Sequence, residues 1–129
     1  MTAIDSFYTL AARARAADHD RYLCALFAPP RARVALFALI LFNAEIARTR
    51  EAVSELMLGQ IRLQWWREAI DEIYQGRIRR HEVVEPLAEA IRAHSLTRGY
   101  FDRLIDALGE PCGALVDLAF DSACPALRQ

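Results

Sequence analysis

Apolar residues recur at the spacing of an α-helix along most of the chain, and polar residues between them supply the expected helix ends. Asp18 or Asp20 can cap a short helix that ends before Ala28, and Pro30 suits the first turn of the next helix. Gly76 can close a later helix in a left-handed conformation. Besides the short helix, the pattern predicts five main helices, over residues 4–17, 30–52, 55–75, 84–94 and 98–108.

The composition also favours an all-helical fold. The chain has 129 residues and is 54% hydrophobic, with many Ala and Leu and few β-branched residues. Residues 1–108 form the predicted helical domain. Residues 109–129 hold two Cys, two Pro and two Gly, and helical periodicity weakens there. We expect an all-α domain followed by an atypical tail.

Charge and cysteine content exclude several classes of protein. All 16 basic residues are Arg and the net charge is −1, so no basic field is present to attract nucleic acid. The three cysteines lack the spacing of a zinc site or a disulfide framework. No signal-peptide pattern is present, and the longest apolar run, residues 34–42, is far shorter than the ~20 residues that cross a bilayer. We expect a cytoplasmic chain that can also contact the inner membrane peripherally.

Two charged residues lie in apolar surroundings on the predicted long helices. Arg62 falls near the middle of the apolar arc of helix 55–75, and Glu45 lies among apolar residues of helix 30–52. An unpaired buried guanidinium would be costly, so we expect an ion pair between Glu45 and Arg62, with Asn43 and Gln64 nearby. This pair is either a structural contact that fixes helix register or part of a polar patch that holds a phosphate or a partner's side chain.

Other residues have structural interpretations. Trp65 and Trp66 lie on a wide apolar face, so we expect them to be largely buried in the core or in a subunit contact, with a lipid pocket as the alternative. The three histidines, His19, His81 and His94, lie in polar stretches and are expected to be solvated. Cys24 is expected to be a small buried hydrophobe.

The stretch from Arg21 to Gly76 contains the combination FNxE, VSE and GxIRLQWWR, which is more specific than any single motif in it. This combination resembles the N-terminal part of the squalene/phytoene synthase family, over roughly residues 18–106. The likeness is greatest to an aspartate-poor branch that includes the mitochondrial assembly factor for respiratory complex I. The resemblance implies part of an isoprenoid-synthase-type helical bundle, either open or completed by self-association. It also implies that the tail, residues 109–129, is truncated or frameshifted.

The same resemblance places the family's first aspartate-rich motif on Ala47, Arg48 and Glu51, of which only Glu51 is acidic. In catalytic members those aspartates hold Mg²⁺ ions that bind the substrate diphosphate. An arginine at position 48 would repel Mg²⁺, although it can contact a phosphate directly. A second aspartate-rich motif belongs to a later part of the family fold than this chain reaches. We therefore expect no catalytic residues, no metal ligands and no cofactor.

Two functions of different classes remain open. The first is a non-catalytic helical module that binds a prenyl or other lipid, a membrane surface, a protein partner or a second copy of the chain. The second is a head-to-head prenyltransferase that uses Mg²⁺, or an inactive remnant of one. The candidate residues for binding a ligand or partner are Asn43, Glu45, Arg48, Glu51, Arg62, Gln64 and Trp66.

Overall fold

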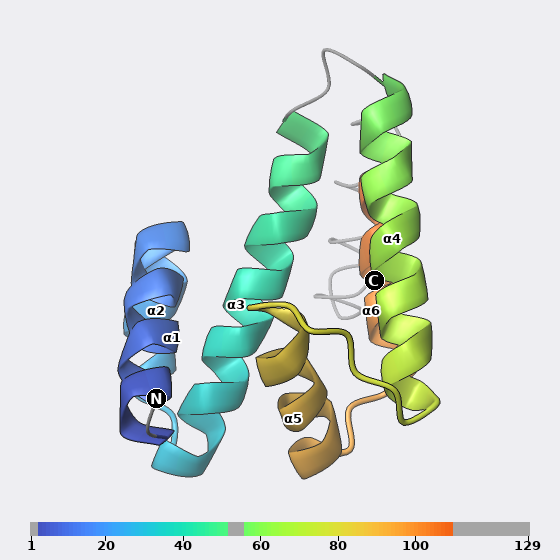
Figure 1. Cartoon of the computed structure of the whole chain (residues 1–129). Helices are drawn as coiled ribbons and strands as arrows, with labels where there is room; N and C mark the ends of the chain where they lie inside the picture. The colour runs from blue at the N-terminus through green and yellow to red at the C-terminus, as the bar shows by residue number, and fades with distance from the viewer. Residues whose placement is uncertain (1–2, 52–55, 110–129) are drawn as a thin grey trace, which may run out of the picture.

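The computed structural model describes residues 3–51 and 56–109, and all regular structure in these ranges is α-helical (Figure 1). The all-α prediction is therefore confirmed, and the bounds of the five main helices agree with the predicted ones to within one residue. The helices are α1 (Ala3–Ala17), α2 (His19–Ala25), α3 (Pro30–Glu51), α4 (Leu56–Tyr74), α5 (Val84–His94) and α6 (Arg98–Gly109).

Local chemistry explains several of these helix ends. The Asp18 side chain accepts a hydrogen bond from the backbone N–H of Arg21 at 3.0 Å and so caps α2. Gly76 follows α4 with a φ of 85°, which glycine adopts without strain. Ser95 ends α5 with a φ of 50°, a left-handed residue that the sequence pattern did not predict. The sequence also offers Ser54 as a cap for α4, but Ser54 lies outside the described residues.

Helix α3 lies at the centre of the bundle and packs against every other helix. Phe37 contacts the rings of Phe7 on α1 and Tyr22 on α2, at centroid distances of 6.0 and 5.5 Å. Phe42, five residues later and therefore about 140° around the helix, contacts Trp66 on α4 and Phe101 on α6. Two hydrophobic faces of α3 thus join the α1–α2 pair to the α4–α6 pair, and this explains why α3 is apolar on more than one side.

Ion pairs fasten the outer elements to one another. Arg67 on α4 bonds Asp106 on α6 at 2.7 Å, and Arg13 on α1 pairs with Glu82 in the connection between α4 and α5. The first pair joins α4 to α6, and the second holds the α4–α5 connection against α1. Within the described ranges, none of the helices has both the length and the apolar character required to cross a bilayer.

Candidate functional site

The described residues contain a cleft between α3, α4 and the α4–α5 connection, which we call the polar cleft. Its cavity volume is about 500 Å³. The cleft contains both residues of the predicted ion pair, Glu45 on α3 and Arg62 on α4, together with aromatic side chains of α4. Its lining residues are Glu45, Arg48, Thr49, Arg62, Trp65, Trp66 and His81.

The α3 wall of the polar cleft is built from residues three and four positions apart, which lie on one side of a helix. The guanidinium Nη1 of Arg48 lies 3.2 Å from Oε1 of Glu45. The Thr49 hydroxyl donates to the backbone carbonyl of Glu45 at 2.9 Å, and Thr49 is buried. The Thr49 hydroxyl is therefore used within α3, whereas Arg48 and Glu45 present charge to the cleft.

The α4 wall repeats the same spacing with Arg62, Trp65 and Trp66. Trp66 is only 4% exposed and packs edge-on against Phe42, whereas Trp65 is half-buried. Arg62 is exposed, and no ion pair of its guanidinium occurs among the described residues. The wall therefore combines an indole surface with a cationic group that has no protein counter-ion in the described ranges.

His81 brings the α4–α5 connection into the cleft. Its ring lies 5.2 Å from Trp65 and 5.5 Å from Trp66 between centroids, and its Nδ1 accepts a hydrogen bond from the backbone N–H of Val83 at 3.1 Å. This hydrogen bond requires Nδ1 to be unprotonated, so a neutral ring carries its proton on Nε2. His81 is half-buried against two tryptophans, so the expectation that it is solvated is met only in part.

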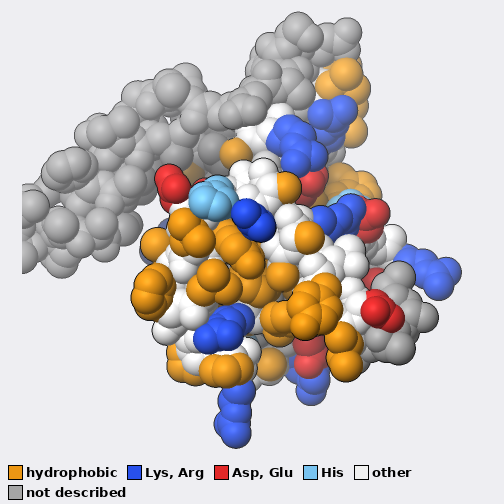
Figure 2. All heavy atoms as spheres, turned by 90° about the vertical axis from the view of Figure 1, so that its left-hand side faces the viewer, with side chains coloured by type: hydrophobic (Ala, Val, Ile, Leu, Met, Phe, Trp, Pro, Cys, Tyr) orange, Lys and Arg blue, Asp and Glu red, His pale blue; other side chains and the backbone are white. Residues whose placement is uncertain are grey.

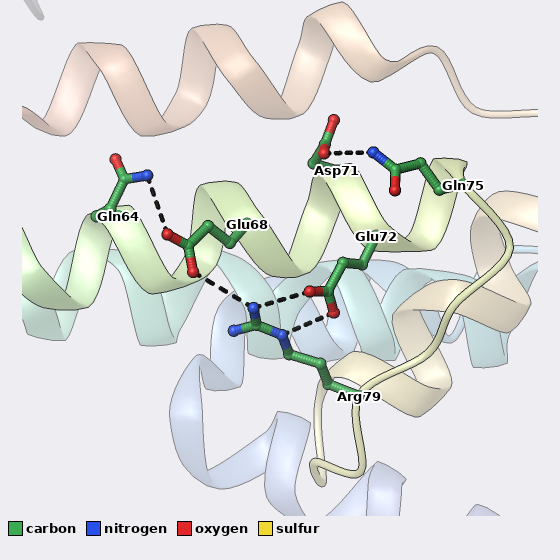
Figure 3. A network of polar contacts seen from close by, with 6 residues as sticks. All are labelled: Gln64, Glu68, Asp71, Glu72, Gln75 and Arg79. Atoms are coloured by element: carbon green, nitrogen blue, oxygen red, sulfur yellow. Dashed lines mark hydrogen bonds and ion pairs between the residues drawn. The ribbon is translucent and has the colours of Figure 1, made fainter.

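A polar network on α4 holds this connection in place (Figure 3). Arg79 donates to both carboxylate oxygens of Glu72, at 2.8 and 3.0 Å, and reaches Glu68 at 3.3 Å. Its guanidinium also lies over the ring of Trp65, 5.2 Å from the centroid. The hydrogen bond from Arg79 lowers the pKa of the Glu72 carboxyl, and the same bond raises the pKa of Arg79. Arg79 thus couples the position of His81 to α4.

The structure brings together four of the predicted site residues: Glu45, Arg48, Arg62 and Trp66. Asn43 lies elsewhere, on the wall of an apolar cavity. Gln64 bonds Glu68 at 3.3 Å and lines a shallow surface site that shares Trp65 with the polar cleft. The side chain of Glu51 lies outside the described part of the chain.

The predicted ion pair between Glu45 and Arg62 does not occur in the structure. Glu45 pairs instead with Arg48, three residues later on the same helix. The prediction assumed that the first turns of α4 are buried, but Met57 and Ile61 are 74% and 58% exposed. Arg62 therefore lies near solvent, where an unpaired guanidinium carries little cost.

Sequence reasoning missed three residues of the polar cleft. Thr49 and Trp65 occupy the same helix faces as predicted residues, so their spacing from Glu45 and Arg62 could have identified them. His81 lies in a polar stretch with no periodic signal, and only the folded connection brings it to the tryptophans.

An apolar groove lies between α2, α3 and α6, with a cavity volume of about 570 Å³. Cys24 lines it and is exposed, so the expectation of a buried cysteine is wrong. The groove is apolar except for Arg21 and Asn43. Its remaining lining residues are Ala25, Leu36, Leu39, Ile40, Phe42, Leu96, Tyr100, Phe101 and Leu104.

The residues present do not fit the Mg²⁺ site that the family resemblance implies. Arg48 takes the place of one expected carboxylate and is paired with Glu45, and Ala47 offers no oxygen ligand. In the part of the chain that the structure describes, no group of three or more His, Cys, Asp or Glu residues is placed to hold a metal ion.

Comparison with known proteins identifies the family. Residues 14–112 match the sequence pattern of the family described as squalene/phytoene synthase. The chain is also similar to NADH dehydrogenase (ubiquinone) complex I, assembly factor 6, with 37% identity over 92 residues to the Bos taurus protein and 34% over 92 residues to the Homo sapiens protein. Each match covers 71% of this chain but only 28% of the relative, and no solved structure shows significant similarity. The chain belongs to the squalene/phytoene synthase family.

Proposed function

We propose that the chain is a non-catalytic, assembly-factor-like helical module whose polar cleft binds an acidic group of a protein partner. The observation that carries this proposal is the exposed guanidinium of Arg62, which faces the cleft without an ion pair among the described residues. A guanidinium presents paired N–H donors that match the two oxygens of a carboxylate. The two relatives named as complex I assembly factors support a protein as the partner.

The electrostatics of the α3 wall support a binding role over a catalytic one. A prenyltransferase of this family would need carboxylates near position 48 to hold Mg²⁺, and here a cation occupies that position and pairs with Glu45. Among the described residues that line the cleft, Arg48 and Arg62 outnumber the one carboxylate, Glu45. An acidic side chain therefore meets a more favourable potential in the cleft than a divalent cation does.

An enzymatic assay separates these two roles. We expect the purified chain, incubated with Mg²⁺ and farnesyl or geranylgeranyl diphosphate, to release diphosphate no faster than a heat-treated control. Steady Mg²⁺-dependent release above that control would overturn the non-catalytic proposal.

A genetic experiment tests the binding role. In the encoding organism, deletion of the gene should lower the amount of assembled NADH dehydrogenase (ubiquinone) complex, measured on native gels and by NADH-dependent ubiquinone reduction. Wild-type and Arg80→Gln chains should restore assembly, because Arg80 is exposed and does not line the polar cleft. Arg62→Gln should restore it poorly. Equal rescue by the two variants would show that the polar cleft is not the partner site.

The apolar groove favours a second candidate function, the binding of a prenyl or other lipid chain. An environment-sensitive fatty-acid probe should bind the protein and be displaced by farnesol. Leu39→Asn, which places an amide in the groove, should weaken probe binding, whereas Ile78→Asn, at an exposed position outside it, should not. Equal binding by the two variants would exclude the groove as the lipid site.

A further inference from the structure

One end of the α1–α2 pair carries large hydrophobic side chains on its surface. We call this patch the apolar end; it consists of Ile4, Tyr8, Leu23, Leu26 and Phe27. Phe27, which follows α2, is 93% exposed, and Ile4 and Tyr8 on α1 are 67% and 66% exposed. Scattered single hydrophobic residues on a surface are ordinary, but five on α1, α2 and the residues that directly follow α2 indicate an interaction surface.

The fold brings these residues to the same side of the molecule. Asp18 alone joins α1 to α2, and the chain reverses there, so the start of α1 and the end of α2 lie at the same end of the bundle (Figure 1). Phe7 and Tyr22 both pack on Phe37, which confirms that the first half of α1 lies beside α2. Figure 2 shows hydrophobic side chains gathered over this face, with arginine side chains among them.

The charges at the apolar end are more positive than negative. Arg31 and Arg33 lie at the start of α3, close after Phe27, and Asp5 lies beside Ile4 on α1, whereas the charges from Arg13 to Arg21 lie toward the turn that joins α1 to α2. Arg31, just after the two prolines that follow Phe27, is exposed and has no ion pair within the described residues. The guanidinium of Arg33 donates a hydrogen bond to the backbone carbonyl of Ala28 at 3.0 Å. This bond holds a second guanidinium close to Phe27, the residue before Ala28.

We propose that the apolar end binds the surface of an anionic lipid bilayer, with Phe27 and Leu23 inserted at the head-group level and Arg31 and Arg33 facing lipid phosphates. Exposed aromatic and aliphatic groups partition into the boundary between head groups and acyl chains, and neighbouring cations are attracted to anionic lipids. This surface lies apart from the polar cleft, and the inference does not depend on the function proposed for that cleft. Phe27 does not line the apolar groove either, so surface binding and lipid uptake into the groove can be separated.

Vesicle sedimentation tests the proposal. The full chain should bind vesicles of phosphatidylcholine that contain phosphatidylglycerol, bind pure phosphatidylcholine vesicles far less, and dissociate as salt is raised. Phe27→Ser should weaken binding about tenfold through the lost insertion of the ring, and Arg31→Glu should weaken it about as much through charge reversal. Both side chains are exposed, so the far-ultraviolet circular dichroism and the thermal midpoint should stay unchanged.

Two matched variants serve as controls. Ile78 is 59% exposed and Arg80 is also exposed, and both lie in the α4–α5 connection away from the apolar end. Ile78→Ser and Arg80→Glu should bind the vesicles as the wild type does. The proposal is overturned if the wild type does not bind, if the controls lose as much binding as Phe27→Ser, or if the lipid charge has no effect. Sedimentation that shows a dimer dissociated by Phe27→Ser would instead assign the apolar end to a second copy of the chain.

Discussion

The guanidinium of Arg48 lies 3.2 Å from the carboxylate of Glu45, one turn earlier on α3. Arg48 is well exposed, so solvent screens the pair and its contribution to stability is small. The contact matters more for the charge of the polar cleft, because it neutralises the only carboxylate among the described residues that line it. Arg62, on the opposite wall, keeps its charge available for an external anion.

A double-mutant cycle can measure this arrangement. Glu45→Gln and Arg48→Gln should show a coupling energy of about 0.5 kcal/mol or less in urea unfolding, as expected for an exposed pair on one helix. Glu45→Gln and Arg62→Gln should be additive, because these two residues do not pair in the structure. A coupling energy of several kcal/mol between Glu45 and Arg62 would instead support the buried ion pair that the sequence predicts.

The contact between Arg79 and Glu72 predicts how the stability of the fold changes as the pH falls. Arg79 lowers the pKa of Glu72 below its ordinary value of 4.5. A lowered folded-state pKa adds stability above the unfolded pKa, and this stability is lost as pH falls through the folded pKa. Arg79→Gln should therefore raise the pKa of Glu72, measured by carboxyl NMR, and reduce the loss of stability between neutral and acid pH.

Arg92→Gln provides the matched control for this measurement. Arg92 forms the same kind of contact with Glu89 on α5 and lowers the pKa of that carboxyl. Arg92→Gln should raise the pKa of Glu89 and leave that of Glu72 unchanged. If Glu72 titrates identically with and without Arg79, the network in Figure 3 does not hold the α4–α5 connection in solution.

The sequence predicted the helices well because their ends depend on local chemistry. The side-chain cap of Asp18, the first-turn position of Pro30 and the left-handed Gly76 each involve atoms within a few residues. Ser95 was missed because a serine with positive φ has no strong signature, so the surrounding fold must impose that conformation.

The polar cleft was predicted only in part, because its geometry depends on how α4 is positioned against α3. Helical periodicity shows that Arg62 shares a face with apolar residues, but it does not show where along α4 the core ends. The core reaches Trp66, Ala69 and Ile70, whereas Ile61 remains exposed. His81 depends on a non-periodic connection that Arg79 holds in place, and no sequence pattern specifies such a connection.

Tyr74 provides a test of how α4 is fastened to the turn between α5 and α6. Its hydroxyl donates to the backbone carbonyl of Leu96 at 2.6 Å. Tyr74→Phe should lower the free energy of unfolding by about 1 kcal/mol in urea denaturation, because the carbonyl loses its donor while the ring packing is kept. Tyr100→Phe should have a smaller effect, since Tyr100 is 63% exposed. Equal losses in the two variants would argue against the Tyr74 hydrogen bond.

The Tyr74 hydroxyl also predicts how the stability of the fold changes at alkaline pH. Burial, followed by the charge of Asp102, raises the pKa of Tyr74 above its ordinary value of 10.0. The contribution of Tyr74 to stability is therefore fully present below the unfolded pKa and is lost as pH rises through the folded pKa. The stability difference between the wild type and Tyr74→Phe should be constant near neutral pH and shrink above about pH 10. A difference that grows with alkaline pH would contradict the assigned environment.

The two tryptophans of the polar cleft should report different environments. Trp66 is only 4% exposed and contacts Phe42 and His81, whereas Trp65 is half-buried. Each variant keeps one of the two tryptophans of the chain: Trp66→Phe keeps Trp65, and Trp65→Phe keeps Trp66. The fluorescence of Trp66→Phe should therefore lie at longer wavelength, and acrylamide should quench it more strongly, than the fluorescence of Trp65→Phe. Trp66→Phe should also lower the free energy of unfolding by about 1–3 kcal/mol, since it leaves space in a close-packed core. Identical spectra and quenching for the two variants would show that the cleft does not hold one indole inside and the other at its surface.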